Sequence, residues 1–484
     1  MRFPGGNGDK QECLMRRLVA LTFCRLYGPP LNNTILMLHS PKGKLYIWIN
    51  FCIFAQYNPN AMKRITLLIL VLCGATGLFA QDFDLPCGNL NYKPEVQTVL
   101  LYADGNQLND PIIPLEDMVE RLTLSFDIID GDGEILNYTF IHCSHDWEPT
   151  DIQRIQYASG FDSDRLDDYA FSRNTLIDYA NYQLRFPKDD MRPTVSGNYL
   201  LIVYGDDMND LYFTRRFMVV DQKAQVSATV PRYPDDLALT NTHQQLDVRV
   251  AMNNYLTGNT QQYSYLTIRQ NGRWDNAAEG LKPTYVYPDY LSFEHNPQTV
   301  FDATNQYRRF NTSNFYFQSE NLAHIRQTDE SFEIDIATCE SRARKAYASY
   351  EDIHGEKFIY VENEDLDNAT EADYCRVNFF YKSEAPLTHE DIYIMGALND
   401  WCFNESNKMR YDYRLRGYTC SMVLKQGYYN FMFVTIDRTN HEVLTDMTAG
   451  NHWETNNVYK LYFYYYNALK GYDELVGYAT VNSH

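Results

Sequence analysis

Apolar and polar residues alternate with a period of two along much of the chain. In residues 122–128 every second residue is apolar, and the same pattern continues through Leu136, Tyr138 and Phe140. This spacing predicts strands with one buried face and one polar face. The intervening residues 130–133, Asp-Gly-Asp-Gly, are types that tolerate a positive φ in tight turns, so a β-hairpin is expected here.

Further segments of this kind extend the strand prediction as far as residue 434. They lie at residues 199–204, 213–220, 246–252, 263–269, 332–336, 377–381, 392–395, 418–424 and 429–434. No helical run of apolar residues is long enough to build a parallel α/β sheet, which removes the usual scaffold of nucleotide chemistry. The expected fold class is all-β, with tandem β-sandwich domains of immunoglobulin-like type.

The polar and Pro-rich segments suggest where these domains meet. Residues 224–236 contain two prolines and are interpreted as a linker or an edge strand, and the acidic stretch 362–373 as a loop. We expect a first sandwich at 82–222, a second β domain at 223–345 and a third, immunoglobulin-like sandwich at 346–484.

A secretory signal peptide is predicted at residues 62–80. A basic segment at 62–64 precedes an apolar run at 65–72, and Ala80 stands before Gln81, the expected first residue of the mature protein. The apolar run is far shorter than the ~20 residues needed to span a bilayer, although a membrane anchor and lipidation at Cys73 remain alternatives. Since a signal peptide acts at an N-terminus, residues 1–61 are interpreted as a mis-called upstream extension, with a real cytoplasmic extension as the alternative.

Composition limits the possible partners. Lys and Arg number 42 against 63 Asp and Glu, a formal charge of −21, so the chain lacks the basic surface that nucleic-acid binding needs. Apolar residues make up 45% of the chain and 40 residues are Tyr, which favours folded strands over disorder.

The cysteines indicate no particular chemistry. No C-x-x-C pair is present, and an exported protein has an oxidising environment available, but we assign no disulfide. Cys402 and Cys420 are near enough in sequence to close a hairpin, while Cys420 also suits a buried apolar strand face. The cysteines after Ala80 are Cys87, Cys143, Cys339, Cys375, Cys402 and Cys420.

Two segments contain ligand-type residues. Residues 130–134 resemble the start of a calcium loop, but Ile135 stands where that loop has glycine and Ile141 where it has a carboxylate. An ordinary turn is favoured. His142 and His145 could bind one zinc ion only if the strand bends between them, since residues three apart in a strand face opposite sides. A strand end closed by a buried Trp147 is favoured.

The sequence gives no sign of catalysis. G-x-S-x-G, P-loop and G-x-G-x-x-G patterns are absent. Paired carboxylates at distant positions could still serve a secreted hydrolase, but a chance pair among so many acidic residues carries no weight. We expect a non-enzymatic protein with no cofactor, no metal and no small-molecule substrate.

The first domain carries a run of residues typical of one known family. In chain order the run includes His142, Cys143, Asp146, Trp147, Ser196, Gly197, Asn198, Tyr199, Arg216 and Phe217, which we interpret as structural. In this order and spacing these residues resemble the plug proteins of the type IX secretion system. The resemblance covers most of residues 90–480, most densely 97–222.

This resemblance implies a place and a partner. Members of the family are periplasmic and associated with the outer membrane, where they close the inner opening of the giant translocon β-barrel when no cargo is engaged. The implied partner is that barrel, and the implied activity is a protein–protein contact. The family pattern does not identify the residues that touch the barrel.

The third domain has a looser likeness to the early-set immunoglobulin-like modules found beside glycogen-active enzymes, some of which bind glucans through exposed tryptophan faces. It includes Asn399, Asp400, Trp401 and residues 427–431. We expect Trp401 to pack at a strand end, since a fold does not carry function with it. An exported glycan-binding protein that uses Trp401 is the alternative function.

Overall fold

The computed structural model describes residues 32–40, 43–51, 87–251 and 258–484. The chain divides into two compact units, residues 1–85 and 86–484. In the first unit β1 (Asn32–Ser40) and β2 (Gly43–Phe51) pair as an antiparallel hairpin. The predicted signal peptide at 62–80 lies outside the described residues. No helix among the described residues has the length and apolar character needed to cross a bilayer.

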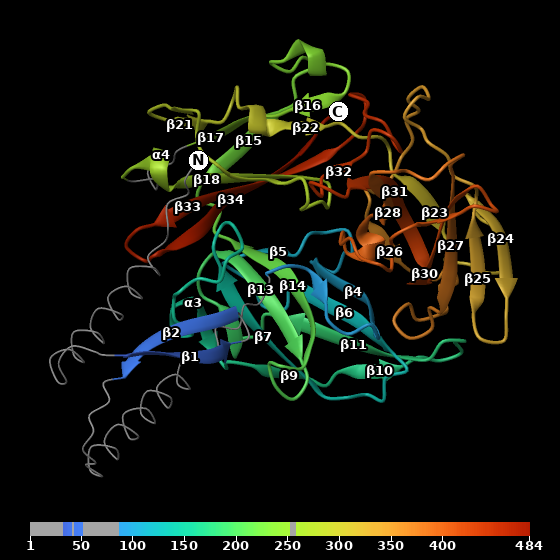
Figure 1. The fold of residues 1–484 in the computed structure, drawn as a ribbon, viewed down its shortest axis with the longest axis horizontal. Helices are drawn as coiled ribbons and strands as arrows, with labels where there is room; N and C mark the ends of the chain where they lie inside the picture. The colour runs from blue at the N-terminus through green and yellow to red at the C-terminus, as the bar shows by residue number, and fades with distance from the viewer. Residues whose placement is uncertain (1–31, 41–42, 52–86, 252–257) are drawn as a thin grey trace, which may run out of the picture. The chain divides into compact units, whose positions relative to one another are not determined.

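The second unit is built from strands, which confirms the all-β prediction of tandem sandwiches (Figure 1). The α-helical segments α3 (Arg154–Tyr157) and α4 (Thr260–Tyr263) are single turns. The 3-10 segments η1 (Leu237–Leu239), η2 (Pro297–Thr299) and η3 (Ala397–Asn399) are equally short.

The first sandwich packs two sheets around a core that includes Phe126, Tyr138 and Phe217. One sheet runs in the order β10 (Tyr169–Phe171), β11 (Tyr179–Phe186), β6 (Leu122–Ile129) and β4 (Val96–Ala103). The other runs β3 (Leu90–Asn91), β14 (Leu211–Val220), β13 (Gly197–Tyr204), β7 (Leu136–Cys143) and β9 (Asp164–Leu166), with β5 (Ile112–Pro114) parallel to β14. A small sheet pairs β8 (Ala158–Gly160) with β12 (Met191–Pro193).

The strands β6 and β7 correct one prediction. Both form where the alternation places them, but they do not pair as a hairpin: β6 pairs with β4 and β11, and β7 with β13 and β9. The turn at 130–133 therefore crosses from one sheet to the other. Alternation shows which face is buried, and in a sandwich both sheets bury a face in the same core. The next strands along the chain, β13 and β14, do pair as an antiparallel hairpin.

The second sandwich combines segments from two parts of the chain. One sheet runs β15 (Gln225–Thr229), β17 (Asp247–Ala251), β21 (Tyr290–Ser292) and β20 (Tyr285–Val286). The other runs β19 (Ala278–Leu281), β18 (Ser264–Gln270), β33 (Val458–Asn467) and β34 (Tyr472–Asn482). A short sheet pairs β16 (His243–Gln245) with β22 (Val300–Asp302).

The third sandwich is formed by the residues between β22 and β33. One layer contains β23 (Arg308–Asn311), β31 (Gly427–Asp437), β26 (Lys357–Ile359), β28 (Glu390–Met395) and β32 (Val443–Leu444). The other runs β24 (Leu322–Gln327), β25 (Phe332–Ile336), β27 (Tyr374–Lys382), β30 (Gly417–Lys425) and β29 (Arg410–Asp412).

The strand pairing crosses the domain boundary expected near residue 345. β25 pairs with β27, although the sequence places it with the second domain, and β33 and β34 pair beside β18, although the sequence places them with the third. In Figure 1 these red C-terminal strands lie beside the green β18. β15 is an edge strand, as one of the two interpretations of 224–236 had it. The boundaries at 222 and 345 themselves stay predictions.

Candidate functional site

The residues singled out by family resemblance gather mostly at the seam between the first and second sandwiches. Trp147 follows β7 and is 4% exposed, which confirms the predicted burial. Arg216 on β14 lies with its guanidinium carbon 4.3 Å from the Trp147 ring centre and 4.7 Å from that of Trp274. Because Trp274 belongs to the second sandwich, this cation–π stack joins the two bodies.

Asn198 and His142 continue the same seam. The Asn198 amide donates to the carbonyl of Ser144 at 2.8 Å and accepts a hydrogen bond from the Tyr464 hydroxyl on β33, also at 2.8 Å. His142 is buried, and burial lowers its pKa to about 4, so its imidazole is neutral. A Cβ atom at Gly197 would lie 2.4 Å from His142 Nε2, so only glycine fits against the ring.

The remaining residues that carry the family resemblance belong to the first sandwich. Tyr199 and Phe217 stack in the core of the first sandwich, their ring centres 5.2 Å apart. Ser196 is buried, whereas Asp146 is exposed and accepts a hydrogen bond from the Ser144 hydroxyl. The Cys143 thiol is 3.6 Å from Cys87 Sγ.

The zinc and calcium alternatives find no assembled ligand set. His142 Nδ1 contacts Thr150 Oγ1 at 2.9 Å, while His145 Nδ1 lies 2.9 Å from the Asp473 carboxylate, so the two imidazoles have different partners. In the described part of the chain, no cluster of three or more His, Cys, Asp or Glu side chains is arranged to hold a metal ion. Glu134 accepts a hydrogen bond from Tyr212.

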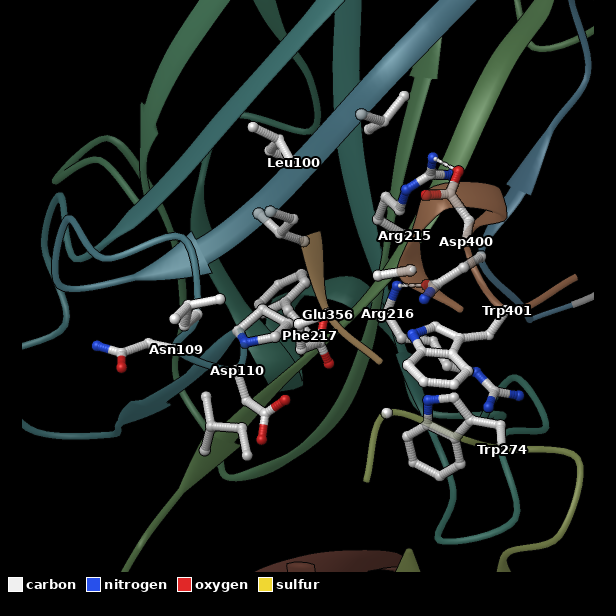
Figure 2. A pocket seen from close by; sticks show the side chains of 18 of the residues that line it. Leu100, Asn109, Asp110, Arg215, Arg216, Phe217, Trp274, Glu356, Asp400 and Trp401 are labelled. Atoms are coloured by element: carbon white, nitrogen blue, oxygen red, sulfur yellow. Dashed lines mark hydrogen bonds and ion pairs between the residues drawn. The ribbon is translucent and has the colours of Figure 1, made fainter. Parts of the chain in front are cut away.

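A cavity of about 130 Å³ lies where the three sandwiches meet (Figure 2). Ion pairs span its walls. Arg215 of the first sandwich contacts Asp400 of the third at 2.7 Å, and Lys357 contacts the other Asp400 oxygen at 3.2 Å. Asp110 of the first sandwich contacts Arg269 at 2.8 Å and Lys460 at 2.6 Å, both in the second.

The paired carboxylates are stabilised as anions. Burial would raise the pKa of Asp400, but Lys357 and Arg215 together hold it below its usual value. Lys460 and Arg269 do the same for Asp110 against its burial. These charges therefore neutralise one another across the junction. They connect the sandwiches and already have partners within the chain.

Glu356 behaves differently in the same cavity. Burial raises the pKa of its carboxyl group, and the nearby Lys460 and Arg269 offset this only in part. Three carboxylates therefore line the cavity: the pKa values of Asp110 and Asp400 are lowered, and that of Glu356 is raised. Catalytic pairs usually combine a nucleophile with a neighbouring base that activates it. The residues that line this cavity include no such pair.

Trp401 forms part of the cavity wall, on the same side as Trp274 in Figure 2. A Cβ atom at Gly272 would lie 2.4 Å from its indole, and one at Gly355 would lie 2.3 Å from it. The ring also meets Tyr307 edge-on, with centres 6.1 Å apart. The indole is half-buried between other segments and does not form an open platform for a sugar.

A second cavity of about 400 Å³ lies in the third sandwich. Its arginines are already engaged by the chain: Arg308 donates to the Glu340 carbonyl, and Arg309 to the Glu351 carbonyl and the Glu320 carboxylate. Cys402 and Cys420 are not bonded to each other, and each thiol contacts a backbone carbonyl.

The comparisons with known proteins concern the first sandwich and the fold. Residues 96–221 match the family model described as "Type 9 secretion system plug protein 1st domain". The resemblance seen in the sequence is confirmed for this plug-family domain, which is the first sandwich. The search of curated proteins gives no match.

A solved structure matches far beyond the plug-family domain. It is the crystal structure of a hypothetical protein from Parabacteroides merdae, 28% identical, and the match covers 82% of this chain and 100% of that chain with a TM-score of 0.78. Two structures titled "Biofilm associated protein", of a BSP domain and a B domain, are 7% identical with TM-scores of 0.16. Their matches cover 83% and 82% of this chain and 61% and 88% of theirs, and carry no argument.

Proposed function

We propose that the protein is a periplasmic plug that closes the inner opening of the type IX secretion translocon barrel when no cargo is engaged. The match of residues 96–221 to the plug family carries the proposal. The plug acts through protein–protein contact, without catalysis or a cofactor. A plug must resist deformation by the pore it fills, so the body that carries this domain must be stiff.

The junctions support the stiffness that this role needs. Charged pairs and stacked rings tie the first sandwich to both others: Asp110 to Arg269 and Lys460, Arg215 to Asp400, and Arg216 to Trp274. Domain interfaces with few contacts allow relative motion, whereas buried interlocking pairs oppose it. The surroundings of Trp401 give no support to the alternative glycan-binding function.

Deletion of the gene tests the proposal. In the deletion strain the translocon stays open without cargo, so we expect higher outer-membrane permeability to a large antibiotic such as vancomycin, while export itself continues. Complementation with the wild-type gene should restore the barrier. A tagged chain should copurify with the barrel from native outer membranes. Unchanged permeability together with no copurification would refute the plug function, and enrichment on an insoluble glucan would favour the glycan-binding alternative.

Export to the periplasm is a separate part of the proposal. The predicted signal peptide at 62–80 leads us to expect Gln81 as the first residue of the periplasmic product. N-terminal sequencing and intact mass of the purified product measure this directly. A product that retains residues before Met62 would refute the proposed start and cleavage sites.

A further inference from the structure

The strand β10 (Tyr169–Phe171) is an open edge of the plug-family domain. It pairs with β11 on one side, and among the residues that the structure describes no strand pairs with its other side. Ser172 donates its N–H to the carbonyl of Tyr179 at 2.8 Å, and Gln183 donates to the carbonyl of Asp168 at 3.0 Å. Antiparallel strands bond at alternate residues, so Tyr169 and Phe171 turn their N–H and C=O groups outward.

Two aromatic rings stand on this edge. Tyr169 is 36% exposed and Phe171 is 53% exposed, and their ring centres are 5.6 Å apart. The Tyr169 ring also lies 5.4 Å from the ring of Tyr182, which is buried in the core. The apolar inner face of the sheet therefore continues past the last strand into solvent. An added strand would extend this face and cover both rings.

The charges before and beside β10 are acidic. The basic Arg173 follows the strand, where its N–H donates to the Thr370 carbonyl at 2.8 Å and its guanidinium lies 3.8 Å from Glu371. Asp167 and Asp168 are exposed immediately before β10, as are Asp130 and Asp132 in the turn between β6 and β7. That turn packs on the edge, since a Cβ atom at Gly133 would lie 2.3 Å from the Tyr169 ring. Acidic flanks repel a second copy of the same edge and attract Lys or Arg, so they select a partner as well as oppose self-association.

Another edge of the same protein shows the contrast. The edge strand β24 (Leu322–Gln327) presents Arg326, which is paired with Asp335 at 2.7 Å and Glu333 at 3.3 Å. Such charges on the strand itself are the usual protection of an exposed edge. β10 has no charged residue within it, and its charges lie only beside it.

We propose that β10 and the acidic turn at 130–133 form the docking surface for an extended, basic segment of the translocon barrel, which adds to the sheet as a further strand. This inference rests on the proposed plug function and names the contact through which it acts. Three residues are too few for a stable interface of ~1,000 Å² or more. The edge therefore fixes the register of a larger contact, and its aromatic rings act as the anchor.

The first test separates backbone pairing from ring contact. Phe171→Pro removes an outward N–H without breaking a bond to β11, and Phe171→Ala removes only the ring. We expect Phe171→Ala to weaken the binding of purified barrel in detergent by about tenfold, and Phe171→Pro to weaken it further. Tyr413→Ala, at a 78% exposed aromatic in the third sandwich, is the matched control and should bind as the wild type does.

A second variant leaves the backbone and rings intact. Asp167→Asn combined with Asp168→Asn should weaken binding and reduce its dependence on salt, because fewer charges face the basic partner. Thermal melting of each variant establishes that it folds. If Phe171→Pro folds, or the double Asn variant folds, and binds the barrel as the wild type does, the docking surface is wrong.

Cross-linking in the native membrane identifies the occupant. A photoreactive phenylalanine analogue at 171 should give an adduct with the barrel, mapped by mass spectrometry to an extended segment rich in Lys or Arg, and the analogue at 413 should not. If the wild-type chain copurifies with the barrel but position 171 gives no barrel adduct, the docking surface fails and the plug function stands. If the wild-type chain does not copurify at all and permeability is unaffected by deletion, the plug function fails with it.

Discussion

The carboxylate of Asp127 lies 2.7 Å from the ammonium group of Lys425, and the two side chains are only 1% and 2% exposed. The pair joins β6 of the first sandwich to β30 of the third. The same carboxylate accepts hydrogen bonds from the Tyr374 hydroxyl at 2.6 Å and from the Asn181 amide at 2.7 Å. Burial lowers the pKa of Lys425, and Asp127 opposes that change. Neither charged group is solvated by water, so each is stabilised by the opposite charge of the other.

Lys425→Met should destabilise the protein strongly. The substitution leaves the Asp127 carboxylate buried without its counter-charge, which costs about 3–5 kcal/mol of unfolding free energy. Urea denaturation measures the loss. The control is Arg438→Met. Its ion pair with Asp391 at 2.6 Å is exposed on the arginine side and screened by solvent, so its loss should change the unfolding free energy little. Equal losses of unfolding free energy in the two variants would contradict the prediction that the buried Asp127 carboxylate needs the Lys425 counter-charge.

Much of the fold follows from periodicity, because alternation reports burial directly. It placed β6, β7, β13, β14, β27, β30 and β31 correctly. Pairing is a different matter: the β6–β7 hairpin was wrong, since the same turn chemistry can connect two strands of one sheet or of opposite sheets. The return of β33 and β34 to the second sandwich depends on contacts about 200 residues apart, which no local pattern encodes.

Residues at the junctions could be singled out from the sequence only where they are large or rare. Trp147 stood out as a large aromatic at a strand end, and its burial could be foreseen. Asp127 and Lys425 are 298 residues apart and are ordinary charges among 42 basic and 63 acidic ones. Asp127 also lies on the polar face of its alternating strand, where an acidic residue is expected, so nothing local marks it as buried. Its partner could not be chosen without the fold.

Trp147→Ala should lower the stability of the seam between the first and second sandwiches. The indole meets Trp274 edge-on with ring centres 5.5 Å apart and covers the Arg216 guanidinium. Its removal opens a cavity and uncovers the half-buried Arg216 guanidinium, so we expect a loss of about 3–5 kcal/mol. Thermal unfolding followed by circular dichroism measures it, with Tyr413→Ala as an exposed aromatic control. An unchanged melting temperature would contradict the burial of Trp147.

His142 should make stability depend on pH in a defined window. Burial lowers its pKa from 6.5 in the unfolded chain to about 4 in the folded protein. The folded state thus binds the proton more weakly, so stability falls as pH drops from 6.5 towards 4, by about 3 kcal/mol in total. Above pH 6.5 the effect disappears.

The test for His142 is a comparison of slopes. His142→Asn keeps a polar group near Thr150 but does not titrate, so the unfolding free energy of this variant should vary less between pH 4 and 6.5. His295→Asn is a control in which the pH dependence of stability should change in the opposite direction, because Asp235 raises the pKa of that exposed imidazole. Parallel pH profiles for the wild type and His142→Asn would contradict the assignment.

Asp400 and Glu356 line one cavity but should respond oppositely to neutralisation. Asp400→Asn is nearly isosteric, and Asn tolerates the positive φ of 54° at this position, so the substitution isolates the charge. It leaves Arg215 and Lys357 buried without their anion, and we expect a loss of about 3–5 kcal/mol near neutral pH. Because the pKa of Asp400 is lowered in the fold, this contribution is present above its unfolded pKa of about 3.9 and is lost as pH falls through the folded value.

Glu356→Gln should have the reverse sign. Burial raises the pKa of Glu356, so the folded protein holds this proton more tightly than the unfolded chain, and its stability falls as pH rises from the unfolded pKa through the folded one. Gln removes that penalty, so the variant should be at least as stable as the wild type at pH 7–8. Urea denaturation of the wild type and both variants across pH 3–8 measures the two trends together. A loss of stability in Glu356→Gln as large as that in Asp400→Asn would contradict the view that one carboxylate ties the junction and the other strains it.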